Sequence, residues 1–357
     1  MILSDLNRDH GLTLPSLFDL GLDECLYPDS VKTMSLESAF YSYRSGEFNV
    51  AYDKFVSEVL SKVSLTSSQL DIVRAQGNRI KKTAAIYFDS CNKQVDRSDI
   101  SESDLYREFD SNGCAGFKLN REELEKLTAA CNSAITKLKS QPDRKTSPTK
   151  HDAYDRMTIL DKNHLAFGLV DKLFKTHGVL DTVTKYNRSK TNLQLDTVAL
   201  HVARSTDTHH YQTLADVPGS PKTISFHMDP KFNVMKAILY LNEVDFNNGP
   251  FTTIPKSNRW HHPEFERILA CGNSVGNYLS SPDHRKAMSI FPERMTKNVI
   301  MGKYFQDGSD NSNILLNNMH KYLSKDADCI LFDPAQTIHR GGLVDVGERV
   351  SLQIIMR

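Results

Sequence analysis

The sequence predicts an α+β protein whose core is an antiparallel β-sandwich or jelly roll, with flanking helices and a helical N-terminal region. Residues 1–100 carry polar, helical patterns, whereas short strand patterns bounded by turn signals begin near residue 191. Within the second region, residues 261–325 are mostly helical or looped. We therefore expect a helical region over residues 1–100 and a sheet domain over 101–357 that contains an insertion at about 261–325.

The N-terminal region contains two helical patterns in residues 35–63, which join at Ser45-Gly46. They fit either the turn and second helix of a tetratricopeptide-like hairpin or any short helical hairpin. Such repeats are stable only when they stack on another surface, so these helices could bind a protein partner. Thr66-Ser67-Ser68 then offers N-cap residues for a further helix that runs towards Cys91.

Three elements and a linker are expected after residue 100 from capping and turn signals. They are a short helix capped by Ser101 with Asp104 and ending at Asn112-Gly113, a strand at 116–119, a helix from Asn120 to about Lys139, and a linker at 140–152. The capping-box pattern of Asn120 with Glu123 is the clearest of these signals, because each side chain can accept a backbone N–H from the other residue.

Strand patterns dominate the rest of the chain, with β-branched and aromatic residues between turn signals. The predicted strands cover residues 191–202, 224–229, 235–244, 251–255, 329–332, 336–339 and 349–356. Asn247-Asn248-Gly249 marks a turn between two of them. Short strands separated by turns in this way are typical of a sandwich or jelly roll.

The composition indicates a soluble globular protein and gives no reason to expect a nucleic-acid or anionic-membrane partner. The 44 basic residues balance 44 acidic ones, so no net charge attracts a polyanion. No apolar run reaches the roughly 20 residues of a membrane helix, and the N-terminus lacks a signal-peptide pattern. The six cysteines have long, irregular spacings, which predict reduced thiols rather than a disulfide framework. We expect a cytoplasmic location.

The strongest chemical signal is the triplet His227-Met228-Asp229. Residues two apart on a strand point to the same face, so His227 and Asp229 project together. They supply two ligands of a 2-His-1-carboxylate metal site, and His339, which follows a predicted strand, is the best candidate for the third. Such a triplet also arises by chance as a surface pair without metal, so it needs support from its surroundings.

That support comes from Arg349 and Ser351, which share one face of a predicted strand and begin ten residues after His339. A guanidinium offers a rigid fork of donors to a carboxylate, and the hydroxyl adds another donor. Both groups suit a buried dicarboxylate. The turn at 345–348 can return this strand alongside that of His339, so we expect metal ligand and carboxylate anchor on neighbouring strands.

Several segments now combine into one pattern: His227-Met228-Asp229-Pro230, then Asn248-Gly249-Pro250-Phe251, then the run Ile254–Arg259, and finally His339-Arg340-Gly341-Gly342 with Arg349. This pattern resembles the phytanoyl-CoA dioxygenase-like family of Fe(II)- and 2-oxoglutarate-dependent oxygenases. The resemblance covers about residues 100–357 and is strongest at 224–260 and 329–357. It departs from the family at Lys256 and Asn258, where relatives carry glycine and histidine.

The resemblance implies a double-stranded β-helix, cupin-like core and a site for Fe(II) on His227, Asp229 and His339. It also implies 2-oxoglutarate as co-substrate, O2 as oxidant, and succinate and CO2 as products. The distal carboxylate of 2-oxoglutarate would pair with Arg349 and Ser351, and Lys236 and Thr337 are further candidates for the co-substrate pocket. The presence of Asp229 favours hydroxylation, because related halogenases carry a small residue there.

Two other functions stay open at this point. A cupin-like hydrolase could hold Zn or Mn on the same three ligands, although it would not need Arg349 with Ser351 as a dicarboxylate anchor. A non-catalytic binding protein with a decayed barrel is the other, although the intact ligand set argues against decay. The substrate could be an amino acid, a sugar, a lipid or a natural-product intermediate, and no sequence feature chooses among them.

Overall fold

The computed structural model describes residues 45–91, 103–141, 155–187, 193–204, 225–232, 234–259, 264–273, 281–291, 299–300 and 308–357. These residues fall into two compact units. The helical unit takes its residues from 1–94, 229–232 and 259–299, and the sheet unit takes its residues from 95–228, 233–258 and 300–357. The predicted division at residue 100 stays a prediction, but the helical unit draws on part of the 261–325 segment.

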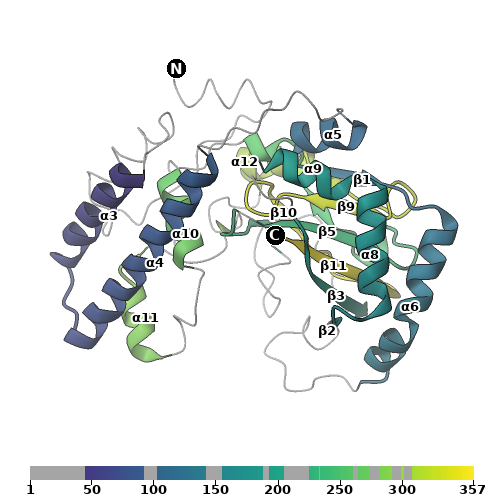
Figure 1. Ribbon diagram of the computed structural model, residues 1–357, viewed down its shortest axis with the longest axis horizontal. Helices are drawn as coiled ribbons and strands as arrows, with labels where there is room; N and C mark the ends of the chain where they lie inside the picture. Colours follow the sequence, from purple (N-terminus) through teal and green to yellow (C-terminus); the bar gives the residue numbers. More distant parts are fainter. Residues whose placement is uncertain are drawn as a thin grey trace. The chain divides into compact units, whose positions relative to one another are not determined.

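The helical unit is built from α3 (Ser45–Leu60), α4 (Ser67–Cys91), α10 (Glu264–Asn273) and α11 (Pro282–Met288). Helices α10 and α11 lie beside α4 (Figure 1). Aromatic rings fill its core: the Phe265 ring lies 5.4 Å from that of Phe48 and 5.8 Å from that of Phe55. Gly272 lets the backbones of α4 and α10 approach closely. A Cβ at this position would lie only 2.9 Å from the Cα of Ile80. Helix α10 therefore packs as core of this unit.

The helix predicted from Thr66 to Cys91 is confirmed as α4. The Thr66 hydroxyl accepts the Gln69 N–H at 3.3 Å, and the Gln69 side chain accepts the Thr66 N–H at 3.1 Å, which is a reciprocal cap. Residues 35–44, the first half of the predicted hairpin, lie outside the described residues.

The sheet unit contains a six-stranded antiparallel sheet in the order β1-β9-β5-β11-β3-β2. Its strands are β1 (Cys114–Phe117), β9 (Cys329–Phe332), β5 (Met235–Tyr240), β11 (Glu348–Met356), β3 (Leu195–Arg204) and β2 (Asp155–Ile159). A second, five-stranded sheet has the order β7-β4-β10-β6-β8. Its strands are β7 (Val299–Ile300), β4 (His227–Met228), β10 (His339–Arg340), β6 (Thr252–Thr253) and β8 (His320–Lys321).

Helices cover one face of the six-stranded sheet. They are α6 (Arg121–Lys139), α8 (Leu165–Thr176) and α9 (Val179–Tyr186), with α5 (Asp104–Asn112) near β1, and Figure 1 shows α6 and α8 along the same side of the sheet. Alternate strand residues such as Val202, Leu239 and Leu352 are buried against these helices. The intervening residues face the other way, where Tyr240 and Phe332 pack in a separate core with other buried apolar residues.

The α+β class with antiparallel sheets is confirmed, whereas closure into a double-stranded β-helix stays a prediction. One local prediction was wrong: the short helix is capped by Ser103, whose hydroxyl accepts the Tyr106 N–H, and not by Ser101, which lies outside the described residues. The 261–325 segment forms α12 (Asp310–Asn317) as well as α10 and α11, and it also supplies the two-residue strands β7 and β8 to the second sheet. Within the part of the chain that the structure describes, no helix is both long and apolar enough to span a membrane.

Candidate metal centre

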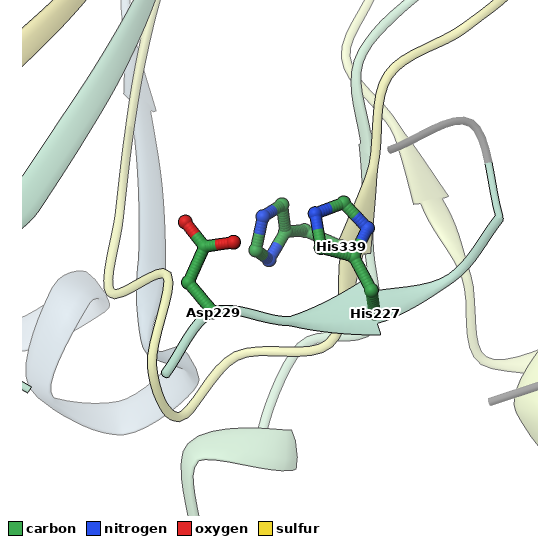
Figure 2. A group of neighbouring side chains, drawn as sticks. All are labelled: His227, Asp229 and His339. Atoms are coloured by element: carbon green, nitrogen blue, oxygen red, sulfur yellow. The ribbon is translucent and has the colours of Figure 1, made fainter. Parts of the chain in front are cut away.

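Strand pairing brings the two predicted histidine ligands together. In the second sheet, β10 runs antiparallel to β4 with His339 directly opposite His227. Side chains at opposed positions share a face and lie close together, and here the ring centroids are 4.3 Å apart. Asp229 follows His227 by two residues, so its carboxylate reaches the same side (Figure 2). The ligand atoms of all three side chains lie within 4.8 Å of one another.

Each imidazole is held by the backbone carbonyl two residues before it. Nδ1 of His227 lies 2.9 Å from the Ser225 oxygen, and Nδ1 of His339 lies 2.8 Å from the Thr337 oxygen. A carbonyl oxygen only accepts, so both Nδ1 atoms carry the proton. The lone pair of each neutral ring is then on Nε2, the atom that a metal would bind.

The histidines lie in an apolar, water-poor setting. His227 is 3% exposed and His339 is 4% exposed. The Phe332 ring lies 4.8 Å from the His339 ring, and the Phe251 ring lies 5.9 Å from it. The two imidazole nitrogens and the Asp229 carboxylate form a donor set that fits a divalent transition metal.

Arg349 and Ser351 share a face of β11, as predicted, but β11 does not pair with the strand of His339. It pairs with β3 and β5 in the six-stranded sheet, whereas β10 belongs to the second sheet. The expectation of neighbouring strands was therefore wrong. Residues 341–347 form a connection that crosses from one sheet to the other instead of a tight hairpin.

The Arg349 guanidinium contacts backbone. Its Nη1 donates to the carbonyl oxygens of Gly342, at 2.8 Å, and of Gly249. These two glycines pack backbone against backbone, because a Cβ on Gly342 would lie 2.3 Å from the Gly249 carbonyl carbon. Arg349 thus joins the turn after β5 to the segment that follows His339. Its pairing with a dicarboxylate stays a prediction, as does that of Ser351, which is buried opposite Tyr240.

The other two predicted pocket residues, Lys236 and Thr337, are each connected to His339 through a neighbouring group. Lys236 of β5 is paired with Phe332, and Phe332 places its ring against that of His339. Thr337 is fully buried, and its hydroxyl donates to the Gly113 carbonyl at 2.8 Å. Thr337 also supplies the carbonyl that holds His339. A contact of either side chain with 2-oxoglutarate stays a prediction.

Arg340 follows His339 and points to the opposite face of β10, in keeping with strand alternation. Its guanidinium lies 4.2 Å from the centroid of the Phe226 ring, and its Nη2 lies 3.9 Å from the Met319 sulfur. Arg340 is therefore separated from the metal-facing side of the sheet.

Comparison with solved structures finds iron- and 2-oxoglutarate-dependent enzymes. SnoK, a non-haem α-ketoglutarate-dependent carbocyclase from nogalamycin biosynthesis, is 11% identical, with a TM-score of 0.41 over 72% of this chain and 84% of its own. The epimerase SnoN, solved with Fe3+, α-ketoglutarate and nogalamycin RO, is 12% identical, with a TM-score of 0.41 over 71% and 81%. EctD from S. alaskensis with bound Fe is 13% identical, with a TM-score of 0.38 over 74% and 78%.

These scores are below 0.5, so the likeness by itself establishes neither a shared fold nor a shared activity. No protein-family model matches the sequence, and no curated protein matches it. Among the described residues, His227, Asp229 and His339 form the one group of His, Cys, Asp or Glu side chains that could hold a metal ion.

Proposed function

We propose that this chain is an Fe(II)- and 2-oxoglutarate-dependent oxygenase that hydroxylates a small organic substrate. The observation that carries the proposal is the pair of buried, opposed histidines whose Nδ1 atoms are occupied by backbone carbonyls. Their Nε2 atoms and the Asp229 carboxylate converge as two nitrogen ligands and one oxygen ligand. This donor set, with further coordination positions left open, is typical of non-haem Fe(II) oxygenases.

Each ligand has a defined part in the proposed site. His227 and His339 would bind Fe(II) through Nε2, while the Ser225 and Thr337 carbonyls keep the rings from rotating. Asp229 would supply the negative charge that partly neutralises the cation. Bound iron would supply the activation of O2, coupled to decarboxylation of 2-oxoglutarate to succinate and CO2. The retained carboxylate of Asp229 favours hydroxylation over halogenation.

The remaining residues would bind the acidic co-substrate. A buried dicarboxylate needs a cationic donor, and Arg349 and Lys236 both lie on the sheet face that carries Phe332. Ser351 on the same face adds a hydroxyl, and Thr337 is a further candidate. The apolar rings of Phe251 and Phe332 would exclude water from His339, which favours a controlled oxidation over uncoupled side reactions.

The proposal is tested by succinate formation coupled to O2 uptake. Protein loaded with Fe(II) should consume 2-oxoglutarate and O2 in equal amounts, slowly without substrate, and His339→Ala should abolish both. His177→Ala serves as the matched control, because His177 pairs with Glu123 at the end of α8 and takes no part in the ligand set. Turnover that needs no O2, or that persists in His339→Ala, would refute the proposal and favour a metal hydrolase or a binding protein.

A further inference from the structure

One peptide group links a buried serine to the metal ligand His339. The carbonyl of Thr337 accepts the His339 Nδ1–H at 2.8 Å. The N–H of Ile338 belongs to the same planar unit and donates to the Ser257 hydroxyl at 2.8 Å. Because the two groups of a trans peptide point in opposite directions, Ser257 holds this unit from the side opposite to His339.

Ser257 itself is fixed within this arrangement. Its side chain is fully buried, and its hydroxyl donates to the Ile254 carbonyl at 2.6 Å, so its one proton is used and its lone pairs face Ile338. The Ile254 N–H in turn donates to the Ile338 carbonyl at 2.9 Å. The serine therefore presents an oriented acceptor.

Hydrogen bonds also hold Thr337, the residue on the other side of the peptide. The Thr337 hydroxyl donates to the Gly113 carbonyl at 2.8 Å, and the Thr337 N–H donates to the Asp333 carbonyl at 2.9 Å. The same Gly113 carbonyl also accepts the Asp333 N–H at 2.9 Å. With Ser257 on one side and Gly113 on the other, little freedom is left for the peptide plane to rotate.

We propose that Ser257 is a positioning residue for His339, acting through the peptide between Thr337 and Ile338. A hydrogen bond to the N–H end of a peptide polarises its carbonyl, which strengthens the bond that the carbonyl accepts. The Ser257 hydroxyl thus makes the Thr337 carbonyl a better partner for Nδ1–H, holds the ring orientation and raises the electron density on Nε2. This inference rests on the proposed metal site and assigns a role to a residue at the start of a short 3-10 helix (Ser257–Arg259) that is not itself one of the three ligands.

The test compares Ser257→Ala with a matched control, Ser324→Ala. Ser324 is also a buried serine of the sheet unit whose hydroxyl accepts a backbone N–H at 2.8 Å, from Val244, but its partners are not ligands of the metal site. Both variants leave one N–H without its acceptor and should lose similar stability in urea unfolding. Only Ser257→Ala should weaken Fe(II) or Co(II) binding in anaerobic calorimetry, by roughly 10- to 100-fold. It should also shift the visible spectrum of bound Co(II).

Equal metal affinity in Ser257→Ala and Ser324→Ala would overturn the inference. If Ser257→Ala does not fold, Ser257→Cys keeps a side chain of similar shape with a weaker acceptor, and it should bind metal with intermediate affinity; unchanged affinity there would also overturn it. Failure of the wild-type protein to bind Fe(II) would instead overturn the proposed function together with the inference. The two failures are therefore distinguishable by the wild-type titration.

Discussion

Replacing Gly113 with alanine should destabilise the sheet unit through backbone strain and a steric clash. Gly113 ends α5 with a φ of 70°, in the left-handed region, where a Cβ costs about 1–2 kcal/mol. The new Cβ would also lie 2.3 Å from the Thr337 hydroxyl oxygen and 2.5 Å from the Asn258 Cβ. Such overpacking lowers the free energy of unfolding by about 1–3 kcal/mol. Alanine also reduces the conformational entropy of the unfolded chain, which raises the free energy of unfolding by about 0.4–1 kcal/mol. The net loss is about 3 kcal/mol, with bounds of about 1 and 5 kcal/mol.

Gly178→Ala is the matched control for this experiment. Gly178 has a φ of 65°, but no atom lies within 4 Å of the position that its Cβ would take. It therefore carries the backbone strain without the clash and should lose about 1 kcal/mol or less. Urea unfolding followed by circular dichroism measures both variants. Gly113→Ala should also weaken metal binding, because the clash displaces Thr337 and its carbonyl holds His339. Equal stability losses in the two variants would refute the reasoning.

Three further predictions follow from individual contacts. Lys256 has a φ of 69°, so Lys256→Gly should raise the free energy of unfolding by about 1 kcal/mol in urea, and a decrease would contradict the strain argument. Arg349→Lys should weaken 2-oxoglutarate binding roughly 10-fold or more, since an ammonium cannot reproduce the guanidinium fork; unchanged binding in a co-substrate titration would remove Arg349 from the pocket. Phe265→Ala should destabilise the helical unit by about 3–5 kcal/mol in thermal unfolding, and a loss below 1 kcal/mol would show that its aromatic core repacks.

The helices that could be predicted from sequence are those with strong caps. The Asn120 and Glu123 side chains each accept a backbone N–H at 2.9 Å, and the helix they start runs from Arg121 to Lys139, close to its predicted limits. Helices α8 and α9 were not predicted. The first is capped by the ring nitrogen of His164, and the second follows Gly178 without a side-chain cap, so neither carries the usual Ser, Thr, Asp or Asn signal.

The strands at the site were harder to predict than its residues. The spacing of His227 and Asp229 predicted that these two side chains lie together, because alternation along an extended chain depends only on local geometry. Residues 224–229 were predicted as one strand, but the strand in the structure contains only His227 and Met228. The length of a strand is set by how many residues pair with a neighbouring strand, and that neighbour cannot be identified from local sequence. The sequence also does not indicate which sheet each strand joins. The strands β10 and β11 were therefore wrongly expected to be neighbours, although they belong to different sheets.

The groups that orient the ligands left no signal in the sequence. Every residue has a carbonyl, and only the folded backbone reveals that those of Ser225 and Thr337 hold the two imidazoles. Ser257 lay within a recognisable motif, but its acceptor role depends on a hydrogen bond to Ile338, 81 positions away. The sequence could therefore predict which three side chains gather at the candidate site, whereas the hydrogen bonds that orient them required the structure.

The central claim is that His227, Asp229 and His339 hold one Fe(II) to which 2-oxoglutarate can bind. Anaerobic titration of the protein with Fe(II) and then 2-oxoglutarate tests it most directly, through the visible metal-to-ligand charge-transfer band of the chelated co-substrate. We expect a band that saturates at one equivalent of iron and is lost in His339→Ala but kept in His177→Ala. No band in the wild-type protein, or a band that persists in His339→Ala, would contradict it.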